Sequence, residues 1–384
     1  MVTPYRVLAL AVSGSMFGVA LLASCASGGS AGNSTTKPPD ATPCTGTIAV
    51  MASEGAAGAP QPAQMNWARV ALDSFNARNG SAFTIEPSNV YDQTSLAEAE
   101  ARRLVADPAL VGVVGPVSSS VTEIAGPIFD AAGVAYVSPS ATADSLTDGH
   151  LKLFFRVVAN NDKQGAAIVH LVTTTLAPKT VLVVDDREVY STNLDQIVAR
   201  SLTRDHIKVD RESVSVGARD YSNVVANIGP ATNVVVMPLV NPNDAQHLVD
   251  QIHAAGKYPA IVGGDDMFSL NDFNEPGAYV PTYAPDVSKT PDGAATLKLY
   301  SEIFGDLAPF AATAYVAMQT VATAALDSCA NGQATRAGVA KDLPHVTLAS
   351  TLLGSPVAFD THHELIGSRY WMYRIEGGGY ELVP

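Results

Sequence analysis

The feature that most constrains the fold is a regular alternation, after residue 44, of short apolar runs with amphipathic segments of helical length. The runs Thr47–Met51, Val111–Gly115 and Thr180–Val184 are rich in Val, Ile and Ala and have no polar residue at every second position. Strands buried on both faces have this composition, and strands separated by helices form parallel sheets. The alternation occurs twice, which predicts an α/β protein with two doubly wound parallel-sheet lobes.

The expected elements follow from hydrophobic periodicity. In the first series, strands are predicted at 47–51, 83–90, 111–115 and 134–137, and helices at 65–78, 95–106 and 118–132. In the second, strands are predicted at 180–184, 207–216, 233–237 and 260–262, and helices at 164–176, 194–203, 221–228 and 245–255. Helices at 292–304 and 310–331 and strands at 356–359 and 370–375 follow.

These later elements fit a chain that crosses back to each lobe before it ends. We place lobe I at 45–156 plus 281–343 and lobe II at 157–280 plus 344–384.

The amino terminus is typical of an export signal. Arg6 gives a positive start, and the apolar run Val7–Leu22 is too short and too rich in Gly and Ser for a membrane span. The Leu-Ala-Ser-Cys sequence that ends at Cys25 resembles a bacterial lipobox, in which the cysteine is diacylated and becomes the new amino terminus. We therefore predict a signal peptide at 1–24, and a lipidated cysteine with a flexible tether at 25–43. The alternative is an ordinary signal peptide with a chance cysteine.

Charge and cysteine content narrow the function further. The chain has 37 acidic and 23 basic residues, a net charge of −14, and no run of Lys and Arg, so nucleic acid is not an expected partner. Besides Cys25, only Cys44 and Cys329 remain, and two cysteines in an exported chain are expected to pair as a disulfide. Two unpaired buried thiols are the alternative. No cofactor and no metal site are expected.

Candidate binding residues come directly after predicted strands, where ligands bind in open parallel sheets. Ser118–Ser120 and Ser138–Thr142 follow two strands of the first lobe, and their hydroxyl groups, with the start of a helix, suit a carboxylate. Tyr190 and Asp265 follow two strands of the second lobe and suit an ammonium group. The serines can equally serve as helix caps, Asp265 can be a solvated turn residue, and Tyr190 can be a packing residue.

The motifs of the sequence give no indication of enzymatic activity. The sequence has no Gly-x-Ser-x-Gly elbow, no Gly-x-Gly-x-x-Gly and no phosphate-binding loop. The turn at 362–364, His-His-Glu, lies between two predicted strands without a second pair of metal ligands, so we interpret it as plain surface.

Several motifs, in this order and spacing, resemble the leucine and branched-chain amino acid binding proteins of ABC importers, in the type I periplasmic binding protein superfamily. The resemblance runs from about Thr47 to Val383. It is carried by the segments 113–120, 136–142, 155–157, 164–165, 183–190, 219–222, 254–256 and 314–326.

The resemblance implies a flytrap architecture, with two lobes joined by three hinge crossings. It implies that Ser119, the turn Ser140–Ala141 and Thr142 take the ligand carboxylate, and that Tyr190 and Asp265 take the ammonium group. Two departures stand out. Asp265 replaces a longer Glu, and the stretch after residue 237 lacks a tyrosine that is common in the family.

The expected function is therefore capture of an amino acid, an amide or a small carboxylate for an ABC permease. The protein is expected to be a monomer, lipid-anchored at the extracytoplasmic face of the cell membrane. A lipoprotein of the same fold that senses the ligand and signals to a partner is the alternative.

Overall fold

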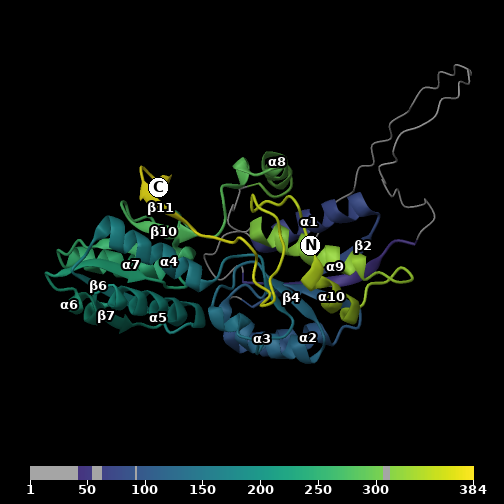
Figure 1. Ribbon diagram of the computed structural model, residues 1–384, viewed down its shortest axis with the longest axis horizontal. Helices are drawn as coiled ribbons and strands as arrows, with labels where there is room; N and C mark the ends of the chain where they lie inside the picture. Colours follow the sequence, from purple (N-terminus) through teal and green to yellow (C-terminus); the bar gives the residue numbers. More distant parts are fainter. Residues whose placement is uncertain (1–41, 54–62, 91–92, 306–311) are drawn as a thin grey trace, which may run out of the picture. The chain divides into compact units, whose positions relative to one another are not determined.

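Two β-sheets organise the described part of the chain, residues 42–53, 63–90, 93–305 and 312–384 of the computed structural model (Figure 1). The first sheet has five parallel strands in the order β2-β1-β3-β4-β5. Its strands are β1 (Thr45–Ala52), β2 (Ala82–Asn89), β3 (Leu110–Val114), β4 (Ala135–Ser138) and β5 (Phe154–Arg156). The predicted signal peptide and Cys25 lie outside the described residues.

Both faces of the first sheet are covered because successive side chains of a strand point to opposite faces. In β1, Ile48 and Val50 pack in one core cluster, whereas Ala49 and Met51 pack in another. The first cluster includes helices α1 (Ala63–Asn79), α9 (Ala312–Asp327) and α10 (Arg336–Asp342), and the second includes α2 (Thr94–Val105) and α3 (Ser119–Ala131). Helix α8 (Gly293–Phe304) adds Tyr300, whose ring stacks on Trp67 with centroids 4.4 Å apart.

The second sheet has seven strands in the order β12-β11-β10-β9-β8-β6-β7. Strands β6 to β10 are parallel, and β11 and β12 add an antiparallel hairpin at one edge. The strands are β6 (Thr180–Asp185), β7 (Lys208–Ser213), β8 (Thr232–Met237), β9 (Ala260–Gly263), β10 (Tyr279–Thr282), β11 (Trp371–Glu376) and β12 (Gly379–Leu382).

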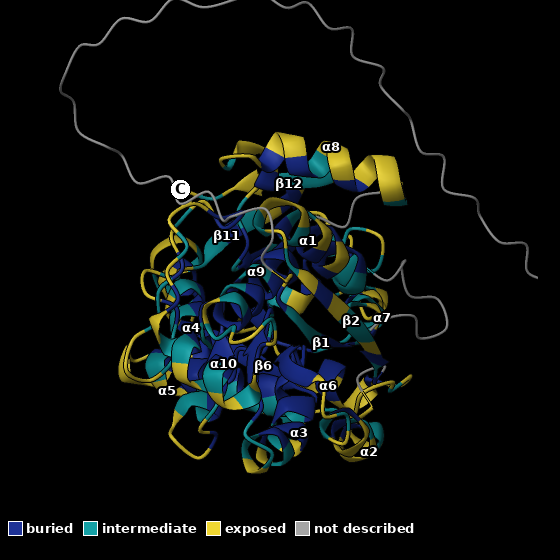
Figure 2. Ribbon diagram, turned by 90° about the vertical axis from the view of Figure 1, so that its right-hand side faces the viewer, coloured by how far each residue is buried: buried dark blue, intermediate teal, exposed yellow. Residues whose placement is uncertain are grey.

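Helices cover this sheet in the same way. Leu182 and Val184 of β6 pack with α6 (Ser222–Asn227) and α7 (Pro242–Ala254), whereas Val181 and Val183 pack with α4 (Asn161–Leu171) and α5 (Val189–Arg204). Figure 2 shows the buried inner parts of the elements in dark blue, with α8 largely exposed. No helix of the described residues is both long and apolar enough for a membrane span.

The chain passes between the two sheets three times, through residues 157–160, 283–286 and 366–370. The predicted fold class, two parallel-sheet lobes of the type I periplasmic binding protein architecture, is confirmed. Strands β5, β10 and β12 and helix α10 were not predicted; they are short, although strands of similar length such as β4 and β9 were predicted from their continuous apolar runs.

One segment packs differently from our expectation. We expected residues 344–384 to belong to lobe II. Strands β11 and β12 do belong to the second sheet, but Val346, Leu352, Val357 and Leu365 are buried in the core cluster that covers the first sheet. These apolar residues are separated by polar residues and glycine without a regular period, so the pattern gives no sign of the core that they join.

A disulfide joins Cys44, just before β1, to Cys329, just after α9. The two residues are 285 positions apart in sequence, and the bond ties the first strand of lobe I to helix α9, which follows strands β6 to β10 of lobe II in the sequence. The bond therefore closes a loop that contains most of the folded chain.

Removal of this disulfide should destabilise the protein, because closing a long loop restricts the unfolded chain. We expect the variant Cys44→Ser/Cys329→Ser to lose about 2–5 kcal/mol of unfolding free energy in urea titrations. A reducing agent should produce the same loss in the wild type and none in the variant. An unchanged midpoint for the reduced wild type would contradict a stabilising role of this bond.

Candidate functional site

A cleft of about 280 Å³ collects residues that follow the carboxyl ends of strands in both sheets. The residues that line it are Ser53, Gln64, Val117, Ser118, Ser119, Ser120, Ser140, Thr142, Glu188, Tyr190, Val216, Val240, Asp265, Asp266 and Tyr283. Five of the six predicted binding residues are among them, and Ala141 is the exception.

The strand order explains why these residues meet. In the first sheet the order reverses between β1 and β3, and in the second sheet it reverses between β6 and β8. At such a point neighbouring connections leave toward opposite faces of the sheet, and a crevice opens beyond the strand ends. Residues that follow β1 and β3 therefore line the cleft together with residues that follow β6 and β8.

The three serines at the start of α3 have separate roles. Ser118 is the N-cap, and its hydroxyl accepts the N–H of Val121 at 3.4 Å. Ser119 Oγ accepts the N–H of Ala143 at 3.2 Å, which leaves its own proton available for a ligand oxygen. Ser120 Oγ accepts the N–H of Val189 at 3.0 Å, from the first turn of α5. Capping and cleft lining therefore coexist in this run.

The turn after β4 is held by side chains behind the cleft wall. Ser138 Oγ accepts the N–H of Ala141 at 2.9 Å, and Ser140 Oγ donates to the carbonyl of Val117 at 2.7 Å. The amide of Ala141 is thus already bonded within the protein, in contrast to the role that the resemblance implies. Thr142 is almost fully buried and lines the cleft, so its hydroxyl and that of Ser119 are the best placed donors of this wall.

Asp265 and Tyr190 form the opposite wall and are bonded to each other. The Tyr190 hydroxyl oxygen accepts the N–H of Asp265 and the side-chain amide of Gln164, both at 3.1 Å. The hydroxyl of Tyr370 donates to Asp265 Oδ2 at 2.8 Å. Burial raises the pKa of Asp265, and hydrogen bonds from Tyr190, Tyr370 and Gln164 oppose that rise.

The phenol groups of this wall stay protonated. Burial, followed by the negative charge of Asp265, raises the pKa of Tyr190 well above its usual value, and the same causes act on Tyr283 and Tyr370. A phenol that keeps its proton can donate a hydrogen bond to a carboxylate. Asp265 is therefore held by neutral donors.

Glycine 264 allows Asp265 and Tyr190 to approach each other. A Cβ atom at Gly264 would lie 2.1 Å from Tyr190 Oη and 3.1 Å from Cα of Pro238. No rotation of the tyrosine ring alone relieves the second contact, because it is with the backbone. The Gly-Gly-Asp sequence at the end of β9 thus serves close packing of the site.

The cleft has a marked charge asymmetry. Glu188, Asp265 and Asp266 line it, whereas none of the described lining residues is Lys, Arg or His. No ion pair joins Asp265 to a basic side chain in the part of the chain that the structure describes. A carboxylate in such surroundings favours a cationic group from a ligand. The opposite wall offers hydroxyl groups and the amino-terminal end of α3, which favours a negative group.

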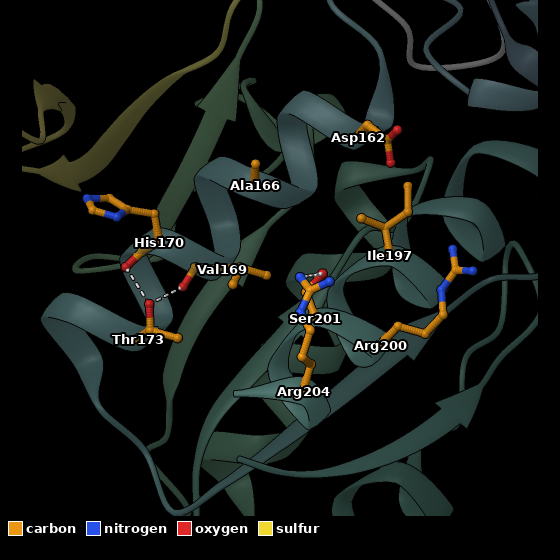
Figure 3. Close-up of a pocket in the computed structure, with 9 residues that line it drawn as sticks. All are labelled: Asp162, Ala166, Val169, His170, Thr173, Ile197, Arg200, Ser201 and Arg204. Atoms are coloured by element: carbon orange, nitrogen blue, oxygen red, sulfur yellow. Dashed lines mark hydrogen bonds between the residues drawn. The ribbon is translucent and has the colours of Figure 1, made fainter. Parts of the chain in front are cut away.

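A larger hollow, of about 670 Å³, lies between α4 and α5 of the second lobe (Figure 3). Its guanidinium groups are engaged locally, since Arg200 donates to the carbonyl of Gln196 and Arg204 to Ser201 Oγ. Helix surfaces, and not strand ends, form its walls. The smaller cleft is therefore the candidate functional site.

Sequence reasoning missed three polar residues of the site, Gln164, Tyr283 and Tyr370. Tyr283 lies just after β10, a strand that was not predicted, and Tyr370 immediately precedes β11. Strand-end position was therefore the signal that could have found Tyr283, whereas Tyr370 does not follow a strand. Val240 lines the cleft in the stretch where the family tyrosine is absent.

The interpretation of residues 362–364 as plain surface was wrong for two of the three residues. The ring of His363 stacks on Phe155 with centroids 3.9 Å apart, and burial lowers its pKa. Glu364 pairs with Arg156, whose side chain has no exposed surface. Among the described residues, no group of three or more His, Cys, Asp or Glu side chains is placed to hold a metal ion.

Comparisons with known proteins agree with this geometry. A family model described as periplasmic binding protein matches residues 46–379, and the chain belongs to this family. An amino acid binding protein of Pseudomonas aeruginosa is 26% identical over 82% of this chain and 86% of its own length. The leucine-specific-binding protein of Salmonella typhimurium is 23% identical over 83% of this chain and 88% of its own length.

Solved structures show the same fold. The branched-chain amino acid transporter substrate binding protein of Streptococcus pneumoniae, in complex with isoleucine, has a TM-score of 0.76 at 24% identity. The match covers 88% of this chain and 99% of that one. A solute binding protein of R. palustris in complex with benzoate has a TM-score of 0.74 at 14% identity, and covers 88% of this chain and 95% of its own. Ligands of different chemistry are thus bound by proteins of this fold.

The raised pKa of Asp265 predicts how stability depends on pH without ligand. A carboxyl group whose pKa is higher in the folded state favours folding at low pH, and this contribution is lost as the pH rises through the folded-state pKa. We expect Asp265→Asn to be more stable than the wild type by about 1 kcal/mol or more at pH 8, because the buried charge is removed, and the difference to shrink toward pH 5.

Thermal unfolding of both proteins across this pH range measures the difference. Asp73→Asn, on the exposed side of α1, is the matched control and should follow the wild type at every pH. A stability difference for Asp265→Asn that does not change with pH would show that this carboxyl group has an ordinary pKa.

Proposed function

We propose that this protein captures an α-amino acid, of branched-chain type or a close relative, for an ABC importer. One observation carries the proposal: among the described lining residues, one wall of the cleft has acids and no basic side chain, and the other has hydroxyl groups and a helix amino terminus. A ligand with an ammonium group and a carboxylate matches both walls. The names of the relatives, which are amino acid and leucine binding proteins, support this choice.

The assignment of ligand groups follows from the donors that remain available. The carboxylate lies against Ser119, Thr142 and the first turn of α3, and the ammonium group lies against Asp265. Val117, Val216 and Val240 add an apolar part of the lining for the ligand side chain. Each charge-assisted hydrogen bond in such a cleft contributes about 1.5–3 kcal/mol, so four of them act against the cost of association with about 6–12 kcal/mol, and burial of the ligand side chain adds to this.

Three related probes test this assignment by calorimetry: L-leucine, 3-methylbutylamine, which lacks the carboxylate, and 4-methylpentanoate, which lacks the amine. We expect L-leucine to bind most tightly. Asp265→Ala should weaken L-leucine binding about tenfold or more and leave 4-methylpentanoate unaffected, since that probe has no ammonium group. Ser119→Ala/Thr142→Val should weaken L-leucine and leave 3-methylbutylamine unaffected.

Asp73→Asn, far from the strand ends, serves as the control and should bind all three probes as the wild type does. A thermal-shift screen of all common amino acids precedes the calorimetry, because ligand at 100 times its dissociation constant adds about 2.7 kcal/mol of stability. If no amino acid in the screen raises the unfolding temperature, the proposal fails.

We also propose that Cys25 carries lipid and anchors the protein at the extracytoplasmic face of the cell membrane. The support is the Leu-Ala-Ser-Cys sequence and the polar tether that follows it. In a bacterial host with lipoprotein processing, the wild type should incorporate labelled palmitate and sediment with membranes. Cys25→Ser should lose the label and appear in the soluble fraction, and a labelled Cys25→Ser protein would contradict the proposal.

A further inference from the structure

Arg156, the last residue of β5, is a buried charge with a single acidic partner among the described residues. Its side chain has no exposed surface, and that of Glu364 is 13% exposed. Arg156 Nε donates to Glu364 Oε2 at 2.9 Å, and Nη2 donates both to Glu364 Oε1 and, at 2.8 Å, to the hydroxyl of Thr147. Thr147 in turn donates to Glu364 Oε1 at 2.7 Å. The guanidinium group is thereby fixed in one orientation.

The remaining nitrogen of Arg156 reaches the cleft wall from behind. Nη1 donates to the carbonyl of Ala143 at 2.8 Å and to that of Ala141 at 3.2 Å. These two carbonyls flank Thr142, and the N–H of Ala143 donates to Ser119 Oγ at 3.2 Å. Arg156 therefore holds the turn that presents Thr142, and through Ala143 it also fixes the hydroxyl of Ser119.

Glu364 is held in place by its own turn. Asp360 Oδ1 accepts the N–H of His362 at 2.8 Å and that of Glu364 at 3.0 Å, and His363 stacks on Phe155 of β5. The turn is thus fixed beside the strand that carries Arg156. It also precedes the third crossing between the sheets, so Glu364 joins that crossing to the first one.

The stability of the fold does not by itself explain this pair. Taking two charges out of water costs about as much as their attraction returns, and apolar residues of similar volume stabilise a core equally well. What an apolar pair cannot do is donate hydrogen bonds to two carbonyl groups in a fixed direction. The geometry of the turn, and not the burial alone, depends on the charges.

We infer that Glu364 is a positioning residue for ligand binding: it orients Arg156, and Arg156 holds the Ala141–Ala143 turn so that Thr142 and Ser119 meet the ligand carboxylate. The inference rests on the proposed function for the identity of the ligand, but the fixation of the turn stands independently of it. Glu364 reaches the site through Arg156 and does not line the cleft.

Hydrogen exchange of the ligand-free full-length protein tests the fixation of the turn. In Glu364→Gln, the amides of Ala141 and Ala143 should exchange at least tenfold faster than in the wild type, while the amides of β6 in the other lobe keep their rates. The matched control is Glu381→Gln, an exposed residue of β12, which should change neither. Equal acceleration in the turn and in β6, or no acceleration in the turn, would overturn the inference.

A second variant distinguishes the role of the Arg156–Glu364 pair in positioning the turn from its effect on the stability of the fold. Arg156→Met/Glu364→Leu should keep a thermal stability close to that of the wild type and still lose protection at Ala141 and Ala143, because the guanidinium group that donates to their carbonyls is gone. Arg374→Met/Glu376→Leu, which replaces an exposed ion pair of β11, is its control. A double variant with full protection in the turn would show that packing alone fixes the turn.

Calorimetry provides the binding readout. Glu364→Gln should weaken L-leucine about tenfold and leave 3-methylbutylamine unchanged, because only the carboxylate half of the site is disturbed. Equal weakening of both probes would indicate general loosening and contradict the inference. If the wild type binds no amino acid, the proposed function fails, and the exchange rates at Ala141 and Ala143 still decide whether Glu364 fixes the turn.

Discussion

The structure of the site depends on one constraint: Asp265 is a desolvated carboxylate that receives hydrogen bonds from phenols and an amide but pairs with no basic residue of the described chain. A buried charge of this kind is unfavourable until a cation approaches. Tyr190 and Tyr370 keep the carboxylate oriented without neutralising it, and Gly264 lets Tyr190 come close enough to do so. Under the proposed function, a cationic ligand group offsets the cost of ionising Asp265 in the cleft.

This arrangement is possible because the two lobes share the same topological feature. Each sheet reverses its strand order once, between β1 and β3 and between β6 and β8, and the crevices at these points contribute the two walls. The walls differ because different residue types follow the strands. Ser119 follows β3 at the start of a helix, whereas Asp265 follows β9 in a glycine-rich turn. Under the proposed function, this chemical asymmetry between similar lobes allows recognition of a ligand with two opposite charges.

Much of the fold could be predicted from sequence, because strands buried on both faces need continuous apolar runs, and β1, β3, β6 and β8 have them. Five predicted binding residues line the cleft because strand-end position is a local property that a sequence displays.

Tyr370 was missed because its contact with Asp265 spans 105 residues, and no local pattern reports such a contact. Glu364 was misread for the same reason, since its partner Arg156 is 208 residues away and the turn around it is polar. The amide of Ala141 bonds to Ser138, a detail of turn geometry that residue types alone do not fix.

The third crossing links the two walls of the cleft. Glu364 precedes it and acts on the hydroxyl wall through Arg156, and Tyr370 ends it and donates to Asp265 on the acidic wall. Two residues of one short segment, Glu364 and Tyr370, thus bear on the two halves of the site. A change in backbone direction along this segment would displace a support of each wall together. Because the same connection joins the lobes, relative movement of the lobes and the quality of the binding site are physically coupled. Under the proposed function, Glu364 therefore affects ligand binding although it does not line the cleft.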